Sequence, residues 1–292
     1  MSLSATAKET SDCGRTPIEP AMGPGPGRII NGREAVPYSW PWQVAICKMV
    51  DAKCDINCGG SIIHPNWILT AAHCTRIGEE AMWRVKSGLF NWRDEMERGV
   101  QISRVERFVN HPMYDLEGTG TANYDLALVK LRDPIVFNDR KQPVCLPNSD
   151  GHLVHGQGIT ITGWGRNDPD TNELPSTLRQ AALFYKTRDV CKREMEGPSG
   201  YYDFEFHDSM FCAGGTDALR GTCNVDSGGP WVVKESDERW YQYAATSFGP
   251  GTRCVNSGTP TGGARVPYMC DFVELVTQMT LCRAPPSPNR PV

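Results

Sequence analysis

A serine set between an acid and two glycines offers the clearest chemistry in this sequence. Ser227 lies within the segment Gly221–Pro230, directly after Asp226 and directly before two glycines. A serine hydroxyl is a weak nucleophile at neutral pH, so catalysis requires a base that takes its proton and an acid that orients the base. Two residues are candidates for these roles: His73 follows an apolar, strand-like run, and Asp125 precedes another.

Each candidate also has an ordinary structural explanation. A lone histidine beside a cysteine, or a lone aspartate before a strand, usually serves packing or hydrogen bonding. The order His73, Asp125, Ser227, with each residue inside an extended motif, favours a catalytic triad. In such a triad Ser227 attacks a carbonyl carbon, His73 shuttles the proton, and Asp125 holds the imidazole.

With these motifs the chain resembles the trypsin-like (chymotrypsin-fold) serine proteases, from about residue 28 to about residue 280. Other segments match the family in the same order: Ile29–Gly32, Ser39–Val44, Cys58–Ser61, Thr162–Gly165, Met210–Gly215 and Ser247–Gly249. Residues 35–44 and 246–248 look most like the pancreatic elastases and chymotrypsins. The resemblance implies an all-β fold of two six-stranded antiparallel barrels with a C-terminal helix. His73 and Asp125 would lie on the first barrel and Ser227 on the second.

The resemblance assigns the oxyanion hole to the backbone N–H groups of Val225 and Ser227. Val225 departs from the family, which has glycine there. Glycine adopts a positive φ without strain, whereas a β-branched residue with positive φ is an outlier. Losing one oxyanion donor typically costs about 10²–10³ in rate. The hole is therefore expected to be collapsed, formed under strain, or formed only with selected ligands.

The primary substrate pocket, by the same resemblance, contains no charged residue. Its base and walls would be Gly221, Thr222, Ser247, Phe248, Gly249 and Thr261. A buried Lys or Arg side chain of a substrate would find no neutralising partner there. Gly249 leaves the entrance open and Thr261 shortens the interior, as in elastase-like relatives. We therefore expect cleavage after medium-sized apolar residues.

A basic residue before two isoleucines, in a Gly/Pro-rich stretch, predicts an activation site between Arg28 and Ile29. The alternative is an ordinary linker arginine. In the family, cleavage at this point frees an amino terminus that pairs with the acid before the catalytic serine, here Asp226. An ion pair removed from water is costly, so this pair would serve as an ordering switch and the chain would be made as a zymogen.

Twelve cysteines indicate an oxidising compartment. No two have Cys-x-x-Cys spacing, which argues against a zinc site. The resemblance implies the disulfides Cys58–Cys74, Cys191–Cys212, Cys223–Cys254 and Cys13–Cys145. We expect the remaining cysteines to pair locally, as Cys47–Cys54 and Cys270–Cys282. No cofactor and no metal is expected, since Leu89 stands where calcium-binding relatives carry a carboxylate.

Composition restricts the partners and the location. The net charge is −4 and the basic residues are scattered, so nucleic-acid binding is not expected. No apolar run approaches the roughly 20 residues of a membrane span. The first ten residues lack the apolar core of a signal peptide, but the cysteines still favour a secreted, extracellular protein. The expected partners are protein or peptide substrates, an activating trypsin-like protease and protein inhibitors.

Strand-like runs separated by turn signals recur along the chain, as in an all-β barrel protein. They cover Gln43–Ile46, Ser61–Leu69, Gln101–Val109, Leu126–Leu131, Gly158–Thr162, Trp231–Val233 and Tyr241–Ser247. A closing helix is predicted over Cys270–Thr280. We expect a pro-segment or linker over residues 1–28, the protease domain over 29–282, and a Pro-rich tail over 283–292.

Two classes of function fit these observations. The first is a secreted serine endopeptidase with an apolar, elastase-like preference. The second is a protease homologue whose oxyanion hole is impaired by Val225 and which binds or regulates more than it cleaves. The intact His73, Asp125 and Ser227 favour the enzyme, because a chain released from catalysis has no physical need of all three.

Overall fold

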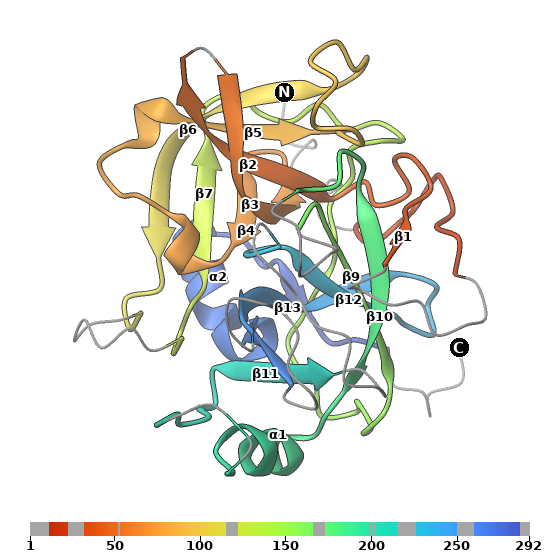
Figure 1. Cartoon of the computed structure of the whole chain (residues 1–292), viewed down its shortest axis with the longest axis vertical. Coiled ribbons are helices and arrows are strands. Elements are labelled where there is room, and N and C mark those ends of the chain that lie inside the picture. Colours follow the sequence, from red (N-terminus) through yellow and green to blue (C-terminus); the bar gives the residue numbers. More distant parts are fainter. Residues whose placement is uncertain are drawn as a thin grey trace, which may run out of the picture.

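Two rings of antiparallel strands lie one above the other in Figure 1, with the strands coloured from orange to yellow-green in the upper ring and those coloured from green to blue in the lower. This computed structural model describes residues 12–22, 32–51, 53–114, 122–165, 173–198, 200, 203–214, 226–249 and 260–286.

The upper ring is a closed barrel of strands in the order β2-β3-β4-β7-β6-β5. Its strands are β2 (Gln43–Val50), β3 (Lys53–His64), β4 (Trp67–Thr70), β5 (Trp83–Ser87), β6 (Gln101–Asn110) and β7 (Ala127–Leu131). In β5 the burial alternates strictly, so that Trp83, Val85 and Ser87 point inward while Arg84 and Lys86 are half-buried. This alternation is what the two-residue period of a strand requires when one face covers a core.

The lower ring closes because β9 pairs with both β10 and β12. Its strands are β9 (Gly158–Gly163), β10 (Arg179–Tyr185), β11 (Met210–Gly214), β12 (Pro230–Lys234), β13 (Trp240–Phe248) and β14 (Thr261–Arg265). The short β1 (Arg33–Glu34) adds to the free part of β10. The predicted all-β fold of two six-stranded antiparallel barrels is confirmed.

The remaining elements are short. They are the α-helices α1 (Arg188–Met195) and α2 (Cys270–Thr277), the 3₁₀ helices η1 (Ala72–Cys74), η2 (Glu80–Met82) and η3 (Val266–Met269), and the parallel pair β8 (Leu146–Pro147) and β15 (Cys282–Arg283). α2 ends where Gln278 takes a left-handed backbone conformation, somewhat before the predicted end of the closing helix. None of the helices in the described ranges is long and apolar enough to cross a bilayer.

The sequence-based strand assignment needs one correction. The run Ser61–Leu69 is not one strand, because a turn at Pro65 and Asn66 divides it between β3 and β4. Proline and asparagine favour turns, and a proline cannot donate to a strand ladder. Four barrel strands and a helix were not predicted, namely β5, β10, β11, β14 and α1, nor were the two-residue strands β1, β8 and β15.

Buried polar contacts join the two barrels. Thr162 Oγ1 on β9 donates to Gln43 Oε1 on β2 at 2.6 Å, and Ser61 Oγ on β3 donates to Gln242 Oε1 on β13 at 2.5 Å. All four side chains are buried. Because a buried polar group left without its partner is costly, these bonds fix how one barrel sits on the other.

The ten described cysteines form five disulfides. These are Cys13–Cys145, Cys47–Cys54, Cys58–Cys74, Cys191–Cys212 and Cys270–Cys282. They are the pairs expected above, three from the resemblance and two from local spacing. The expected pair Cys223–Cys254 lies outside the described residues.

Candidate active site

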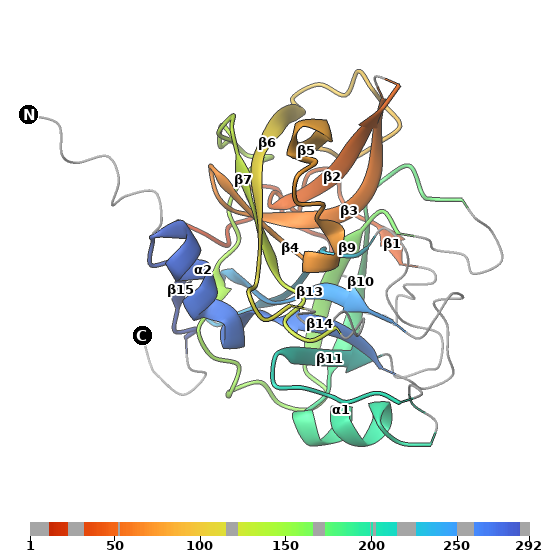
Figure 2. The ribbon, with the colours of Figure 1, turned by 90° about the vertical axis from the view of Figure 1, so that its left-hand side faces the viewer.

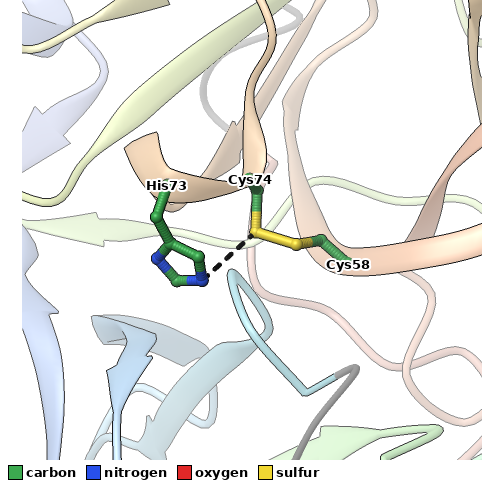
Figure 3. A group of neighbouring side chains, drawn as sticks. All are labelled: Cys58, His73 and Cys74. Atoms are coloured by element: carbon green, nitrogen blue, oxygen red, sulfur yellow. Dashed lines mark hydrogen bonds between the residues drawn. A yellow bond between two sulfur atoms is a disulfide. The ribbon is translucent and has the colours of Figure 1, made fainter.

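His73 lies in η1, directly after β4. Cys74, the next residue, is bonded to Cys58 on β3, so the histidine backbone is fixed to two neighbouring strands (Figure 3). His73 Nε2 lies 3.7 Å from Cys74 Sγ. Although these three side chains gather as metal ligands do, the two sulfurs are bonded to each other and supply no thiolates.

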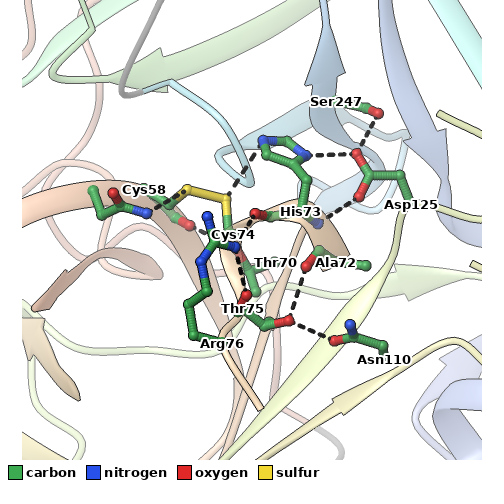
Figure 4. Close-up of polar contacts among 12 residues, drawn as sticks. Cys58, Thr70, Ala72, His73, Cys74, Thr75, Arg76, Asn110, Asp125 and Ser247 are labelled. Carbon is green, nitrogen blue, oxygen red and sulfur yellow. Dashed lines mark hydrogen bonds and ion pairs between the residues drawn. A yellow bond between two sulfur atoms is a disulfide. The ribbon is translucent and has the colours of Figure 1, made fainter. Parts of the chain in front are cut away.

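Asp125 lies two residues before the start of β7, with its side chain only 2% exposed. Its carboxylate accepts three hydrogen bonds (Figure 4). The backbone N–H of His73 donates to Oδ1 at 2.9 Å, while His73 Nδ1 and Ser247 Oγ lie 2.7 Å and 2.5 Å from Oδ2. Asp125 therefore holds both the backbone and the ring of the histidine, and it fixes Nδ1 as the protonated ring nitrogen.

The pKa of His73 lies above its ordinary value of 6.5. Burial of the ring lowers this pKa, but the hydrogen bond and the negative charge of Asp125 raise it more, while Arg76 opposes them weakly. A carboxylate beside an imidazole favours its protonated form. At pH values above the raised pKa, Nε2 is unprotonated and can accept a proton.

Ser227 precedes β12 of the second barrel and lies beside β3, the strand to which His73 is anchored. Its carbonyl accepts the N–H of Gly59 at 2.8 Å, beside the disulfide that anchors His73. The next residue, Gly228, has a φ of +75°, and a Cβ there would lie 2.1 Å from Thr70 Oγ1. Only glycine fits this turn, which seats Ser227 against the end of β4 and the start of η1.

Within the described residues, no hydrogen bond joins Ser227 Oγ to His73 Nε2. Such bonds are often long or poorly aligned until a substrate is bound. The other expected oxyanion residue, Val225, lies outside the described residues.

Asp226 is buried beside β9. Its Oδ1 accepts the N–H of Gly165 at 2.9 Å, and it lines a small cavity of about 20 Å³ together with Gly32 and Arg179. Arg179 also donates to the carbonyl of Gly32. Arg28 and Ile29, the expected activation residues, lie outside the described residues.

The segment that precedes these activation residues is bound to the second barrel. The Cys13–Cys145 disulfide holds one end of it. Near the other end, Gln180 Nε2 donates to the carbonyl of Ala21 at 3.1 Å. Arg179 and Gln180 are neighbours on β10, so the chain before residue 23 and the chain after residue 31 are held at adjacent positions of one strand.

Several expected pocket residues lie close together at the ends of β13 and β14. Thr261 Oγ1 donates to the carbonyl of Phe248 at 2.9 Å, and a Cβ on Gly262 would lie 2.0 Å from the Phe248 ring. Gly249 follows Phe248 at the end of β13. The expected pocket residues Gly221 and Thr222 lie outside the described residues.

Ser247 has a role that the sequence analysis did not assign to it. It was expected only as a pocket residue, but its hydroxyl bonds the carboxylate of Asp125. No local motif signals this contact, because Asp125 and Ser247 come from different barrels and meet only in the folded chain.

Comparisons with known proteins agree with this geometry. The sequence profile of the family described as Trypsin matches residues 29–273. The chain is 30% identical over 274 residues to the Homo sapiens protein named transmembrane protease serine 5, which covers 93% of this chain and 55% of that protein. It is 34% identical over 253 residues to serine proteinase stubble of Drosophila melanogaster, covering 86% of this chain and 30% of that protein. The chain thus spans about half the length of the first relative and less of the second.

Proposed function

Because the chain belongs to the trypsin family of serine proteases, we propose that it is a serine endopeptidase that hydrolyses peptide bonds in proteins or peptides. One observation carries this proposal above the others: the Asp125 carboxylate holds both the backbone N–H and the Nδ1 of His73, at 2.9 Å and 2.7 Å. This contact directs the free nitrogen Nε2 away from the acid, as a general base for serine requires.

In the proposed mechanism Ser227 Oγ attacks the carbonyl carbon of the scissile bond, and its proton passes to His73 Nε2. The imidazolium that forms is stabilised by Asp125, and it then gives the proton to the leaving amine. In the second half of the reaction His73 takes a proton from water, the water attacks the acyl-enzyme, and His73 returns the proton to Ser227 as the acid product leaves. The backbone N–H groups of Val225 and Ser227 would bind the oxyanion, where preorganised donors stabilise the transition state most.

We infer that the chain is a zymogen activated by cleavage after Arg28. The new amino terminus at Ile29 would insert and pair with Asp226. The cavity supports this step, because Gly32 and Asp226 line it together. The segment 29–31 spans at most about 10 Å when extended, so a terminus anchored at Gly32 has reach enough to find a nearby carboxylate. The Cys13–Cys145 disulfide would keep the cleaved segment attached.

The proposed specificity is elastase-like, for medium-sized apolar residues before the scissile bond. Thr261, whose side chain is almost fully buried, supports it by occupying space at the expected pocket base. None of Ser247, Phe248, Gly249 and Thr261 carries a charge that would neutralise a basic substrate side chain.

We also propose that the protein is secreted and works outside the cell. Five disulfides support this location, since such bonds persist in oxidising compartments. In the proposed organisation, residues 1–28 are the pro-segment or linker, residues 29–282 form the protease domain, and residues 283–292 form a Pro-rich tail. An activating trypsin-like protease and protein inhibitors are the proposed partners besides substrates.

A second candidate function is a protease homologue that binds or regulates instead of cleaving. The observation that favours it is Val225, a β-branched residue at the expected oxyanion position. This candidate keeps the barrels and the His73–Asp125 contact but forms no functional oxyanion hole.

Labelling with a serine-directed phosphonate after limited trypsin treatment separates the two candidates. For an enzyme, we expect the label on Ser227 in trypsin-treated chain, and none in Ser227→Ala or in Arg28→Gln, which trypsin cannot cleave at that site. Peptide hydrolysis should appear together with the label. Unlabelled and inactive protein, with cleavage after Arg28 verified by mass spectrometry, would favour the binding homologue.

A further inference from the structure

Ser209 connects the second barrel to the loop that carries Asp125. It lies directly before β11, and its side chain is 1% exposed. Its hydroxyl accepts the backbone N–H of Tyr124 at 3.0 Å and donates to Asn123 Oδ1 at 2.5 Å. Asn123 and Tyr124 are the two residues immediately before Asp125. One buried hydroxyl therefore fixes both the side chain of Asn123 and the backbone of Tyr124, next to the triad acid.

The loop at this point has an unfavourable backbone conformation. Tyr124 has a φ of +52°, in the left-handed region that bulky side chains rarely adopt. Such a conformation is unfavourable and persists only when its surroundings enforce it. Its N–H is bonded by Ser209, and its carbonyl accepts the N–H of Leu126 at 2.7 Å across Asp125. The conformation of Tyr124 sets the direction in which the next residue leaves the loop.

Ser209 is itself held in place. Its carbonyl accepts the N–H of Arg265 at 2.8 Å, and Arg265 Nη1 donates to the carbonyl of Asp208 at 3.2 Å. The Arg265 guanidinium is in turn fixed by two hydrogen bonds of 2.6 Å to Asp150, a buried residue. A bidentate pair of this kind restrains the orientation of the guanidinium. Ser209 is therefore a rigid point of the second barrel.

We propose that Ser209 is a positioning residue that fixes Asp125 against His73 by holding Asn123 and Tyr124. It touches neither substrate nor the reacting atoms, and it acts through the loop alone. The proposal rests on the proposed function, because the geometry it maintains is that of the proposed triad. It makes the alignment of the first-barrel pair, Asp125 and His73, depend on the second barrel.

A matched control is available in Ser61. This serine is also buried, and its hydroxyl also crosses between the barrels, to Gln242 Oε1 at 2.5 Å. Ser61 belongs to β3 and makes no bond to the loop before Asp125 among the described contacts. Ser61→Ala removes one hydrogen bond between the barrels and Ser209→Ala removes two, but only Ser209→Ala releases the two residues before Asp125.

The experiment compares the pKa of His73, followed by NMR of the labelled imidazole, in wild type, Ser209→Ala and Ser61→Ala. Ser209→Ala should lower the pKa of His73 toward its ordinary value, since a displaced Asp125 bonds the ring less well. In activated protein kcat should fall about tenfold with little change in KM, because small misplacements of catalytic groups cost up to about 10²-fold. Ser61→Ala should lower the unfolding free energy and leave the pKa of His73 unchanged.

An unchanged pKa of His73 in Ser209→Ala would overturn the proposal and leave Ser209 a purely structural residue. If Ser209→Ala does not fold, Asn123→Ala removes the same side-chain contact from the other partner, and it must lower the pKa of His73 for the proposal to stand. The titration does not require activity, so an inactive wild-type chain would refute the proposed function without deciding this inference. If the wild type is active and the pKa of His73 is the same in Ser209→Ala and Asn123→Ala as in the wild type, the proposed function stands and this inference is refuted.

Discussion

Removing the Ser247 hydroxyl should raise the pKa of His73. Ser247 Oγ donates to Oδ2 of Asp125 at 2.5 Å, and His73 Nδ1 bonds the same oxygen at 2.7 Å. Two donors on one carboxylate oxygen compete for its negative charge. In Ser247→Ala the Oδ2 atom of Asp125 no longer accepts the serine hydroxyl, so its negative charge interacts more strongly with His73. The protonated form of His73 therefore gains stability relative to the neutral form.

The size of the shift follows from the strength of this hydrogen bond. A hydrogen bond to a charged group contributes about 1.5–3 kcal/mol, and the lower end applies because Ser247 is only half-buried and water can replace it in part. The bond is present whether His73 is neutral or protonated, so only the difference between these states moves the pKa. If about half of the lower value is that difference, the pKa rises by roughly half a unit, at 1.36 kcal/mol per unit.

The assay is an NMR titration of His73 in wild type and Ser247→Ala, with the pH dependence of kcat/KM measured on activated protein. The acid limb of the rate profile should move to higher pH by the same amount. Ser103→Ala, which removes a buried hydroxyl on β6, serves as the control and should move neither. A lowered His73 pKa in Ser247→Ala would refute the competition and mean that Ser247 orients Asp125.

Three further outcomes are expected. Peptides with Leu, Met, Ala or Val before the scissile bond should be cleaved better than those with Lys or Arg, and Thr261→Gly should extend the preference toward Phe and Tyr by about 1–3 kcal/mol in kcat/KM; a peptide-library profile dominated by basic residues would contradict this. Val225→Gly should raise kcat more than it changes KM, because the N–H of that residue matters chiefly once the oxyanion forms; if the variant and the wild type cleave a short ester at the same rate, and a longer peptide likewise, valine is tolerated with the hole formed. Asp125→Asn should lower the pKa of His73, which is raised in the folded wild type. A raised folded pKa contributes stability that is fully present below about pH 6.5 and lost as the pH rises through the folded value; the difference in unfolding free energy between wild type and Asp125→Asn should therefore be larger near pH 6 than near pH 9.

The barrel fold was predictable because the apolar runs and the family motifs agree. β6 is ten residues long, and the five residues of β7 are apolar except for Lys130. Among the missed strands, β5 does alternate apolar and charged residues, whereas β14 lacks any such signal. β14 reads Thr-Gly-Gly-Ala-Arg, which resembles a turn, and only pairing with β11 and β13 makes it a strand. Tertiary contacts decide such segments, and a single sequence does not display them.

The triad residues of the site were predictable from the sequence, but the contacts that support them were not. Motifs around His73, Asp125 and Ser227 predicted which residues to consider, since each lies within a run of matching neighbours. No motif signals which residues support Asp125, although Ser247 lies in a segment that matches the family. Ser247 and Ser209 are separated from it by many residues and reach it from the other barrel, through contacts that the sequence does not encode locally.

The two ends of the described chain are exchanged between the barrels. β1 precedes the first barrel in the sequence but pairs with β10 of the second. α2 follows the second barrel, but its Phe272 ring lies 4.8 Å between centroids from the ring of His111, the residue after β6 of the first. Figure 2 shows β1 and α2 on opposite sides of the molecule. Each half of the molecule is thus completed by an arm from the far end of the polypeptide. Because each barrel packs against a segment from the other end of the sequence, the two barrels should unfold in a single cooperative transition and not one after the other. A chain nicked between β8 and β9 should accordingly remain interlocked, and the isolated halves should regain structure only when mixed.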